Sequence, residues 1–127
     1  MRCKMSGFNA LLLAGFGGFI GAFFRVLVGF GAGKILPTNF AYATLFVNTI
    51  GSFLMGIFLN LELPPQVKLF LIAGICGGFT TFSSFSYESL MFLQNGEILK
   101  FGLNLALNIT LCIVACYLGM ITFKLSH

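Results

Sequence analysis

Four apolar stretches, each close to the length of a membrane-spanning helix, account for most of this chain of 127 residues. They cover about residues 8–32, 42–61, 69–93 and 101–123, and short connections with charged, Pro or Asn residues separate them. A helix needs about 20 apolar residues to cross a hydrocarbon core of about 30 Å. The pattern therefore predicts an all-α membrane protein with four transmembrane helices, folded as a single transmembrane domain over residues 1–127.

The composition favours the same class. Of all residues, 58% are hydrophobic and 8% are charged, whereas a soluble domain has about a quarter charged residues. A chain this apolar cannot cover itself with polar groups, so we expect membrane lipid to be its solvent. The formal net charge of +4 does not indicate nucleic acid as a partner, because the seven basic residues are scattered singly and form no patch.

The basic residues also bear on how the chain inserts into the bilayer. With an even number of spans, both termini and the second connection lie on one side of the membrane. That side holds Arg2, Lys4, Lys68 and Lys124, and the other side holds Arg25, Lys34 and Lys100. Four against three is too small a difference for the positive-inside rule to give an orientation. Such a chain can insert both ways and pair head to tail; the alternative is that Arg2 and Lys4 alone decide the orientation.

Catalytic and metal-binding side chains are scarce. Cys76, Cys112 and Cys116 lie within apolar stretches, and the last two are one helical turn apart. No His or carboxylate joins them in the sequence to complete a metal site, so we interpret them as small buried hydrophobes. No nucleophile, base and orienting group can be assembled, so we do not expect an enzyme.

The first stretch has small residues and one charge at every fourth position. Gly17, Gly21 and Arg25 share one face of a helix, and Gly29 and Gly33 continue it. Such a stripe lets another backbone come close, which assigns Gly17 and Gly21 a packing role. A charge at this depth is costly in lipid, so Arg25 faces protein or water, or extends to the nearer headgroups. We favour a structural role for Arg25 over a transport role.

Asparagines interrupt the second and fourth stretches. Asn48 lies inside an apolar run, where an unpaired amide costs about 1–3 kcal/mol, so it must meet another helix, water or a passing solute. On the fourth stretch, Asn104, Asn108 and Cys112 line up one turn apart. Two amides on one stripe indicate either a polar lining or a seam of interhelical hydrogen bonds, and spacing alone does not separate these.

The third stretch contains an unusual polar run, GICGGFTTFSSFSYE, over residues 74–88. Gly77 and Gly78 are followed by hydroxyl residues, a combination that is poor in helix interiors. It predicts a helix broken near the bilayer centre, at about residues 77–81. Unwound backbone at that depth frees carbonyls that can bind a cation. The alternative is a continuous helix rich in Ser and Thr.

Two aromatic residues and one carboxylate follow in the same stretch. Phe82 and Phe85 share a helix face, where aromatic residues usually serve packing. A Phe ring has a positive edge, so two edges turned inward would favour a small anion over a cation. Glu88 lies about 9 Å from the end of the stretch, and an ionisable group at that depth is a functional candidate. It also fits a vestibule residue or a helix-pairing partner.

Three motifs resemble one known family, the small bacterial fluoride channels of the Fluc/CrcB type. They are GGFIGAFFR (17–25), TLFVNTIGSF (44–53) and GICGGFTTFSSFSYE (74–88), and the likeness extends over essentially the whole chain. The resemblance implies a fluoride-selective channel that passively exports fluoride and lowers its cytoplasmic concentration. It also implies an antiparallel, dual-topology homodimer with two pores, in the inner or plasma membrane of a bacterium.

The same resemblance implies roles for individual residues. Phe82 and Phe85 would line the pores with their ring edges toward fluoride, and Asn48 would donate its amide. The backbone carbonyls of Gly77 and Thr80 from both subunits would hold a structural sodium ion that is not transported. A polar track along the path would consist of Thr81, Ser84 and Glu88. The chain departs from the family along the fourth helix, where small or hydroxyl residues are usual and Asn104, Asn108 and Cys112 stand.

One other class has a similar layout, the small dual-topology multidrug exporters that are coupled to protons. For that class we expect an essential Glu in the first helix and Trp around the substrate. This chain has no Trp, and Glu88, its intramembrane Glu, is in the third stretch. The sequence therefore favours the channel over the exporter.

Overall fold

The computed structural model describes residues 6–125 of the chain, all of whose regular elements are helical. In chain order these elements are α1 (Gly7–Ile35), α2 (Tyr42–Asn60), α3 (Pro65–Lys68), η1 (Leu69–Cys76), α4 (Gly77–Phe79), α5 (Phe82–Gln94) and α6 (Ile98–Leu125). Together, α3, η1, α4 and α5 follow one another along a single span.

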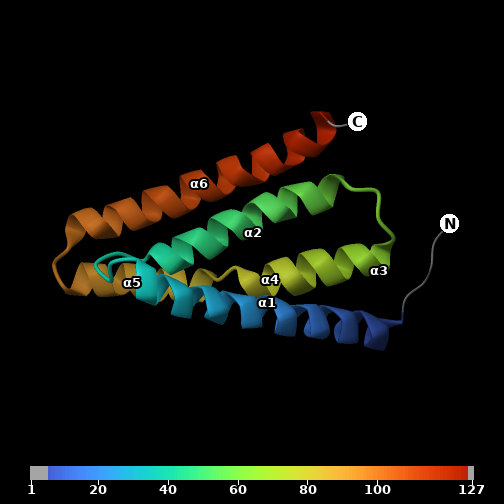
Figure 1. The fold of residues 1–127 in the computed structure, drawn as a ribbon, viewed down its shortest axis with the longest axis horizontal. Coiled ribbons are helices and arrows are strands. Elements are labelled where there is room, and N and C mark those ends of the chain that lie inside the picture. Colours follow the sequence, from blue (N-terminus) through green and yellow to red (C-terminus); the bar gives the residue numbers. More distant parts are fainter. Residues whose placement is uncertain (1–5, 126–127) are drawn as a thin grey trace.

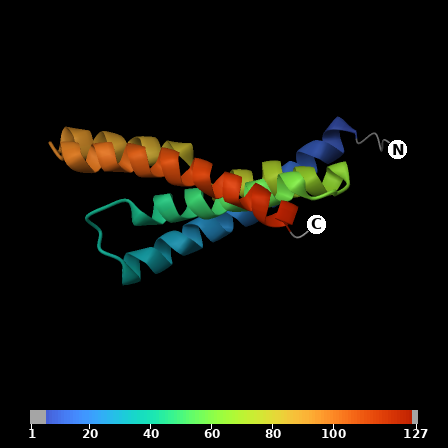
Figure 2. The same cartoon turned by 90° about the horizontal axis from the view of Figure 1, so that it is seen from above.

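The described residues form four spans that are long and apolar enough to cross a membrane: Gly7–Ile35, Tyr42–Asn60, Pro65–Gln94 and Ile98–Thr122. This confirms the prediction of four membrane helices. Figure 1 shows the four rods running along the long axis of the molecule, with α1 beginning and α6 ending at the same end. The main packing pairs are α2 with α6, and α1 with η1 and α4. Seen from above, α5 and the start of α6 diverge from α1 and α2 (Figure 2).

Three spans are longer than the sequence pattern predicts, and local chemistry accounts for the first and the third. The first continues to Ile35 because Lys34 lies in the last turn, where a positive charge suits the negative end of the helix dipole. It ends where Leu36 becomes extended ahead of Pro37. The third begins at Pro65, since Pro is well accommodated in the first turn of a helix.

Within the third span, helical geometry changes twice. The segment η1 is a π-helix, in which the hydrogen bonds join residues that are five positions apart. Short π-helical segments often occur at functional sites. Gly77 keeps helical dihedral angles (φ −63°, ψ −37°), so the glycine pair itself is not unwound. The extended residues are Thr80 (ψ 157°) and Thr81 (φ −149°, ψ 117°), between the end of α4 and the start of α5.

The glycines of α1 lie directly against the backbone of the third span. A Cβ atom on Gly17 would meet the carbonyl oxygen of Phe70 at 2.5 Å and the Cα atom of Gly74 at 2.8 Å. A Cβ atom on Gly21 would collide with the carbonyl oxygen of Ile75 and would lie 2.7 Å from the amide nitrogen of Phe79. Backbone atoms cannot swing aside as side chains do, so these positions accept only glycine without a shift of the helices.

We predict that Gly21→Ala lowers the thermal stability of the purified protein, because the added methyl group forces α1 away from η1 and α4. Overpacking of this kind costs about 1–3 kcal/mol. The matched control is Gly29→Ala on the same helix, where a Cβ atom meets nothing within 4 Å. Thermal midpoints in detergent should fall for the first variant and stay level or rise for the second. Equal midpoints would contradict this account of the packing.

Candidate functional site

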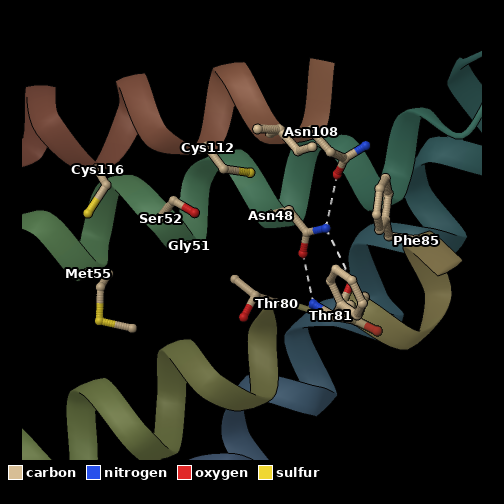
Figure 3. Close-up of a pocket in the computed structure, with 12 residues that line it drawn as sticks. Asn48, Gly51, Ser52, Met55, Thr80, Thr81, Phe85, Asn108, Cys112 and Cys116 are labelled. Atoms are coloured by element: carbon tan, nitrogen blue, oxygen red, sulfur yellow. Dashed lines mark hydrogen bonds between the residues drawn. The ribbon is translucent and has the colours of Figure 1, made fainter. Parts of the chain in front are cut away.

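A cavity of about 310 Å³ lies where α2, α6 and the extended Thr80–Thr81 segment meet (Figure 3). It brings together four residues that the sequence singled out on two different stretches: Asn48, Thr81, Phe82 and Phe85. The wall from α6 includes Asn108, Cys112 and Cys116. The cavity therefore combines hydrogen-bonding groups, aromatic rings and thiols around one interruption of the third span.

Asn48 binds the extended segment through both ends of its carboxamide. Its Oδ1 atom accepts from the backbone N–H of Thr81 at 2.7 Å, and its Nδ2 atom donates to the Thr81 carbonyl at 3.2 Å. The same Nδ2 atom donates to the Oδ1 atom of Asn108 at 3.1 Å. An amide group has two N–H donors, so both are engaged by protein. The partner that the sequence required for Asn48 is thus the interrupted backbone together with α6.

Thr81 also caps the helix that follows it. Its Oγ1 atom accepts from the backbone N–H of Ser84 at 3.1 Å and donates to the Ser84 hydroxyl at 3.2 Å. A Thr at this position satisfies one of the N–H groups that the first turn of a helix leaves without a partner. The capping contact fixes where α5 begins, and it thereby sets the position of Phe82 and Phe85 on that helix.

Two backbone N–H groups, those of Thr81 and Ser84, donate to side-chain oxygens in place of backbone carbonyls. In a continuous α-helix the N–H of Thr81 would serve the carbonyl of Gly77, and the N–H of Ser84 would serve that of Thr80. Here the first N–H donates to Asn48 and the second to the Thr81 hydroxyl. The carbonyls of Gly77 and Thr80 are therefore left without their helical donors.

Arg25 contacts protein within the membrane-spanning part of the chain. Its Nε atom donates to the carbonyl of Gly78 at 3.0 Å, joining α1 to α4. It also lines a second cavity of about 230 Å³, which contains Thr81, Ser84 and Glu88. Among the described residues, the Oε1 atom of Glu88 is buried without a hydrogen-bond partner. Thr81 lines both cavities, so both adjoin the same extended segment.

The two candidate pore aromatics have different surroundings. Phe85 is 6% exposed and packs inside the chain, whereas Phe82 is 77% exposed. Their ring centroids are 5.4 Å apart and the planes are tilted by 51°, so the rings are in contact. Both line the first cavity. The sequence spacing predicted that both rings share one helix face, but it did not indicate that Phe82 is exposed while Phe85 is buried.

The asparagines of α6 form interhelical hydrogen bonds. Asn104 is fully buried, with 0% exposure, and its Nδ2 atom donates to the hydroxyl of Ser89 on α5 at 2.9 Å. Asn108 donates to the carbonyl of Asn104 at 2.9 Å and to its side-chain oxygen at 3.0 Å. Of the two readings that spacing left open, Asn104 therefore belongs to a bonding seam, and Asn108 belongs to the seam and to the cavity wall. Nothing in the sequence singled out Ser89.

Comparison with known proteins gives a consistent result. Residues 12–120 match the model of a family described as "CrcB-like protein, Camphor Resistance (CrcB)". A protein of Campylobacter jejuni subsp. jejuni serotype O:23/36 (strain 81-176), named fluoride-specific ion channel FluC, is 47% identical over 120 residues, which are 91% of this chain and 98% of the relative.

Two further relatives carry the same name. The one from Campylobacter hominis is 42% identical over 125 residues, which cover 94% of this chain and 99% of the relative. The one from Shewanella sp. (strain ANA-3) is 43% identical over 115 residues, with coverages of 87% and 93%. The family match spans most of the four-helix chain, and these relatives align over nearly their full length. This chain therefore belongs to the CrcB-like family and is a multi-pass bacterial membrane protein.

Proposed function

We propose that the protein is a fluoride-selective ion channel that passively exports fluoride and so lowers its cytoplasmic concentration. The observation that carries the proposal is the cavity at the Thr80–Thr81 interruption, lined by Asn48, Phe82 and Phe85. It lies in a chain whose relatives are named fluoride-specific ion channels. We propose passive flow rather than proton-coupled export: no carboxylate or His lines the first cavity, and the carboxyl group of Glu88 lies in the second cavity.

The chemistry of the lining suits a small anion. Fluoride leaves its water shell only where N–H or O–H donors and positive ring edges replace that water. The hydroxyls of Thr81 and Ser84, which with Glu88 form the proposed polar track, line the second cavity and continue the path beyond the aromatics. Asn48 would offer fluoride a donor by releasing one of its present partners, the Thr81 carbonyl or Asn108.

A structural sodium ion at the interruption is part of the proposal. The carbonyls of Gly77 and Thr80 fit this role because the N–H groups that would bind them in a helix are directed elsewhere. Oxygen atoms are the ligands that hard cations prefer. When bound, sodium supplies a positive charge next to an anion path whose first cavity has no Lys or Arg in its lining.

The proposed assembly is an antiparallel homodimer with the interruption near the bilayer centre. Two carbonyls from one chain are too few for a sodium ion, and a second copy would double the number of oxygen ligands. The nearly even distribution of basic residues supports insertion in both orientations. The exposed ring of Phe82, beside the first cavity, gives this surface an apolar group that a second copy would cover.

The proposal predicts that purified protein in liposomes releases fluoride far faster than chloride, with or without a proton gradient. A channel needs only the fluoride gradient, because nothing in its cycle takes up a proton. Efflux is followed with ion-selective electrodes, and protein-free liposomes serve as the control. Fluoride efflux that stops without a proton gradient would indicate an exporter, and equal release of chloride would rule out selectivity.

Replacing either aromatic with an aliphatic residue should slow fluoride release while the assembly remains intact. Phe82→Ile and Phe85→Ile keep bulk but remove the positive ring edge, and a loss of about 1.4 kcal/mol lowers a rate roughly tenfold. The control is Phe24→Ile on α1, the same change at an exposed ring outside the cavity. If both cavity variants release fluoride as the control does, the rings serve packing alone.

Long dialysis against a large organic cation should abolish fluoride release if sodium is a structural component. Flux is measured after sodium is replaced completely on both sides, and again after sodium is restored. Recovery on restoring sodium distinguishes a lost ion from denatured protein. Undiminished flux in the sodium-free liposomes would leave Gly77 and Thr80 without a cation and remove this part of the proposal.

A further inference from the structure

A directed series of hydrogen bonds runs from the interruption of the third span through Asn48 on α2 and two asparagines on α6 to Ser89 on α5. Figure 3 shows the bonds that Asn48 makes to Thr81 and to Asn108. The N–H of Thr81 donates to Asn48 Oδ1 at 2.7 Å, and Asn48 Nδ2 donates to Asn108 Oδ1 at 3.1 Å. Asn108 Nδ2 donates to Asn104 Oδ1 at 3.0 Å, and Asn104 Nδ2 donates to Ser89 Oγ at 2.9 Å. We call these four side chains and the Thr81 N–H the amide relay.

The direction of the amide relay is determined from both ends. At one end, the backbone N–H of Thr81 can only donate, so the oxygen of Asn48 must face it and its Nδ2 atom must point toward α6. Toward the other end, the backbone carbonyl of Asn104 can only accept, so the Nδ2 atom of Asn108 must face it. The Oδ1 atom of Asn108 is then the atom that meets Asn48. Reversing any one amide would set two donors or two acceptors against each other.

Because these side chains are buried, few other groups are available to replace the hydrogen bonds between them. Asn104 is 0% exposed and Ser89 is 5% exposed, so water has little access to these two, whereas Asn108 is 6% exposed and lines the first cavity. In the hydrocarbon region an unsatisfied polar group has no alternative partner. The double contact of Asn108 with Asn104, to both its backbone and its side chain, holds Asn108 in one orientation.

We infer that Asn104 and Asn108 are positioning residues, which orient the carboxamide of Asn48 so that it holds Thr81 in its extended conformation. By this route Asn104 also affects the geometry of the interruption, although of these two asparagines only Asn108 lines the first cavity. The consequence for conduction rests on the proposed fluoride channel, whereas the effect on Thr81 does not. Loss of Asn108 frees Asn48 to rotate, and the Thr81 N–H then loses its acceptor for part of the time.

The test compares Asn108→Leu and Asn108→Ser with wild type and with a matched control, Asn60→Leu. Asn60 also joins α2 to α6, through a 2.5 Å hydrogen bond to the carbonyl of Met120, but it lies outside the amide relay. Leucine keeps the branched shape of Asn108 without its polar atoms, and serine keeps a polar group in a smaller side chain, while neither provides an acceptor at the same reach. The readouts are amide hydrogen exchange at Thr81, resolved by NMR in detergent, and fluoride efflux from liposomes.

We expect Thr81 to exchange roughly threefold to tenfold faster in both Asn108 variants, as the loss of one hydrogen bond implies, and fluoride efflux to fall. The Asn60→Leu control should change neither. Unchanged exchange at Thr81 in whichever Asn108 variant folds overturns the inference, and so does equal acceleration in the control. Faster exchange with undiminished efflux overturns the link to conduction. If wild type conducts no fluoride, the proposed channel fails while the exchange at Thr81 still decides the positioning role.

Discussion

The structure depends on satisfying backbone N–H groups where a membrane helix is interrupted. In lipid such a group has no water to bind, so an interruption persists only where other parts of the protein supply acceptors. Here Asn48 accepts from Thr81, and the Thr81 hydroxyl accepts from Ser84. These two side-chain acceptors do more than permit the interruption. Because they take the N–H groups that would serve Gly77 and Thr80 in a continuous helix, these two carbonyls lack their helical donors, and Thr80 lines the cavity that contains the two aromatic rings.

Close approach of the helices is the second condition for this geometry. Gly17 and Gly21 let the backbone of α1 contact η1 and α4 directly, which brings Arg25 to the carbonyl of Gly78. On the other side of the molecule, Gly56 and Gly119 bring α2 and α6 together, with hypothetical Cβ atoms colliding with the opposite backbone. The distance between α2 and α6 is what lets Asn48 meet Asn108. The glycines thus position the polar contacts although they make none themselves.

Three of the cysteines and Glu88 differ in whether their side chains face a cavity or are buried in protein. Cys112 and Cys116 face the first cavity, whereas Cys76 is buried away from it, although all three lie in apolar helices. Glu88 lines the second cavity together with Arg25, so the wall of this cavity contains both a carboxyl group and a guanidinium group. A membrane helix exposes such groups only toward protein or toward a water-filled space, because lipid cannot solvate them.

The sequence by itself determined the four helices that are long and apolar enough to span a membrane. It also indicated close packing at Gly17 and Gly21, although Gly29 and Gly33, which continue the same stripe, have nothing within 4 Å of a hypothetical Cβ atom. These features depend on length, apolar content and local spacing, which are properties of neighbouring residues. Only the tertiary structure decided that Thr80 and Thr81 are extended while Gly77 stays helical, and that Asn104 pairs with Ser89. The physical reason is that a polar group in lipid bonds to the partner that the packing of distant helices brings within about 3 Å. The local composition of the chain does not determine which partner that is.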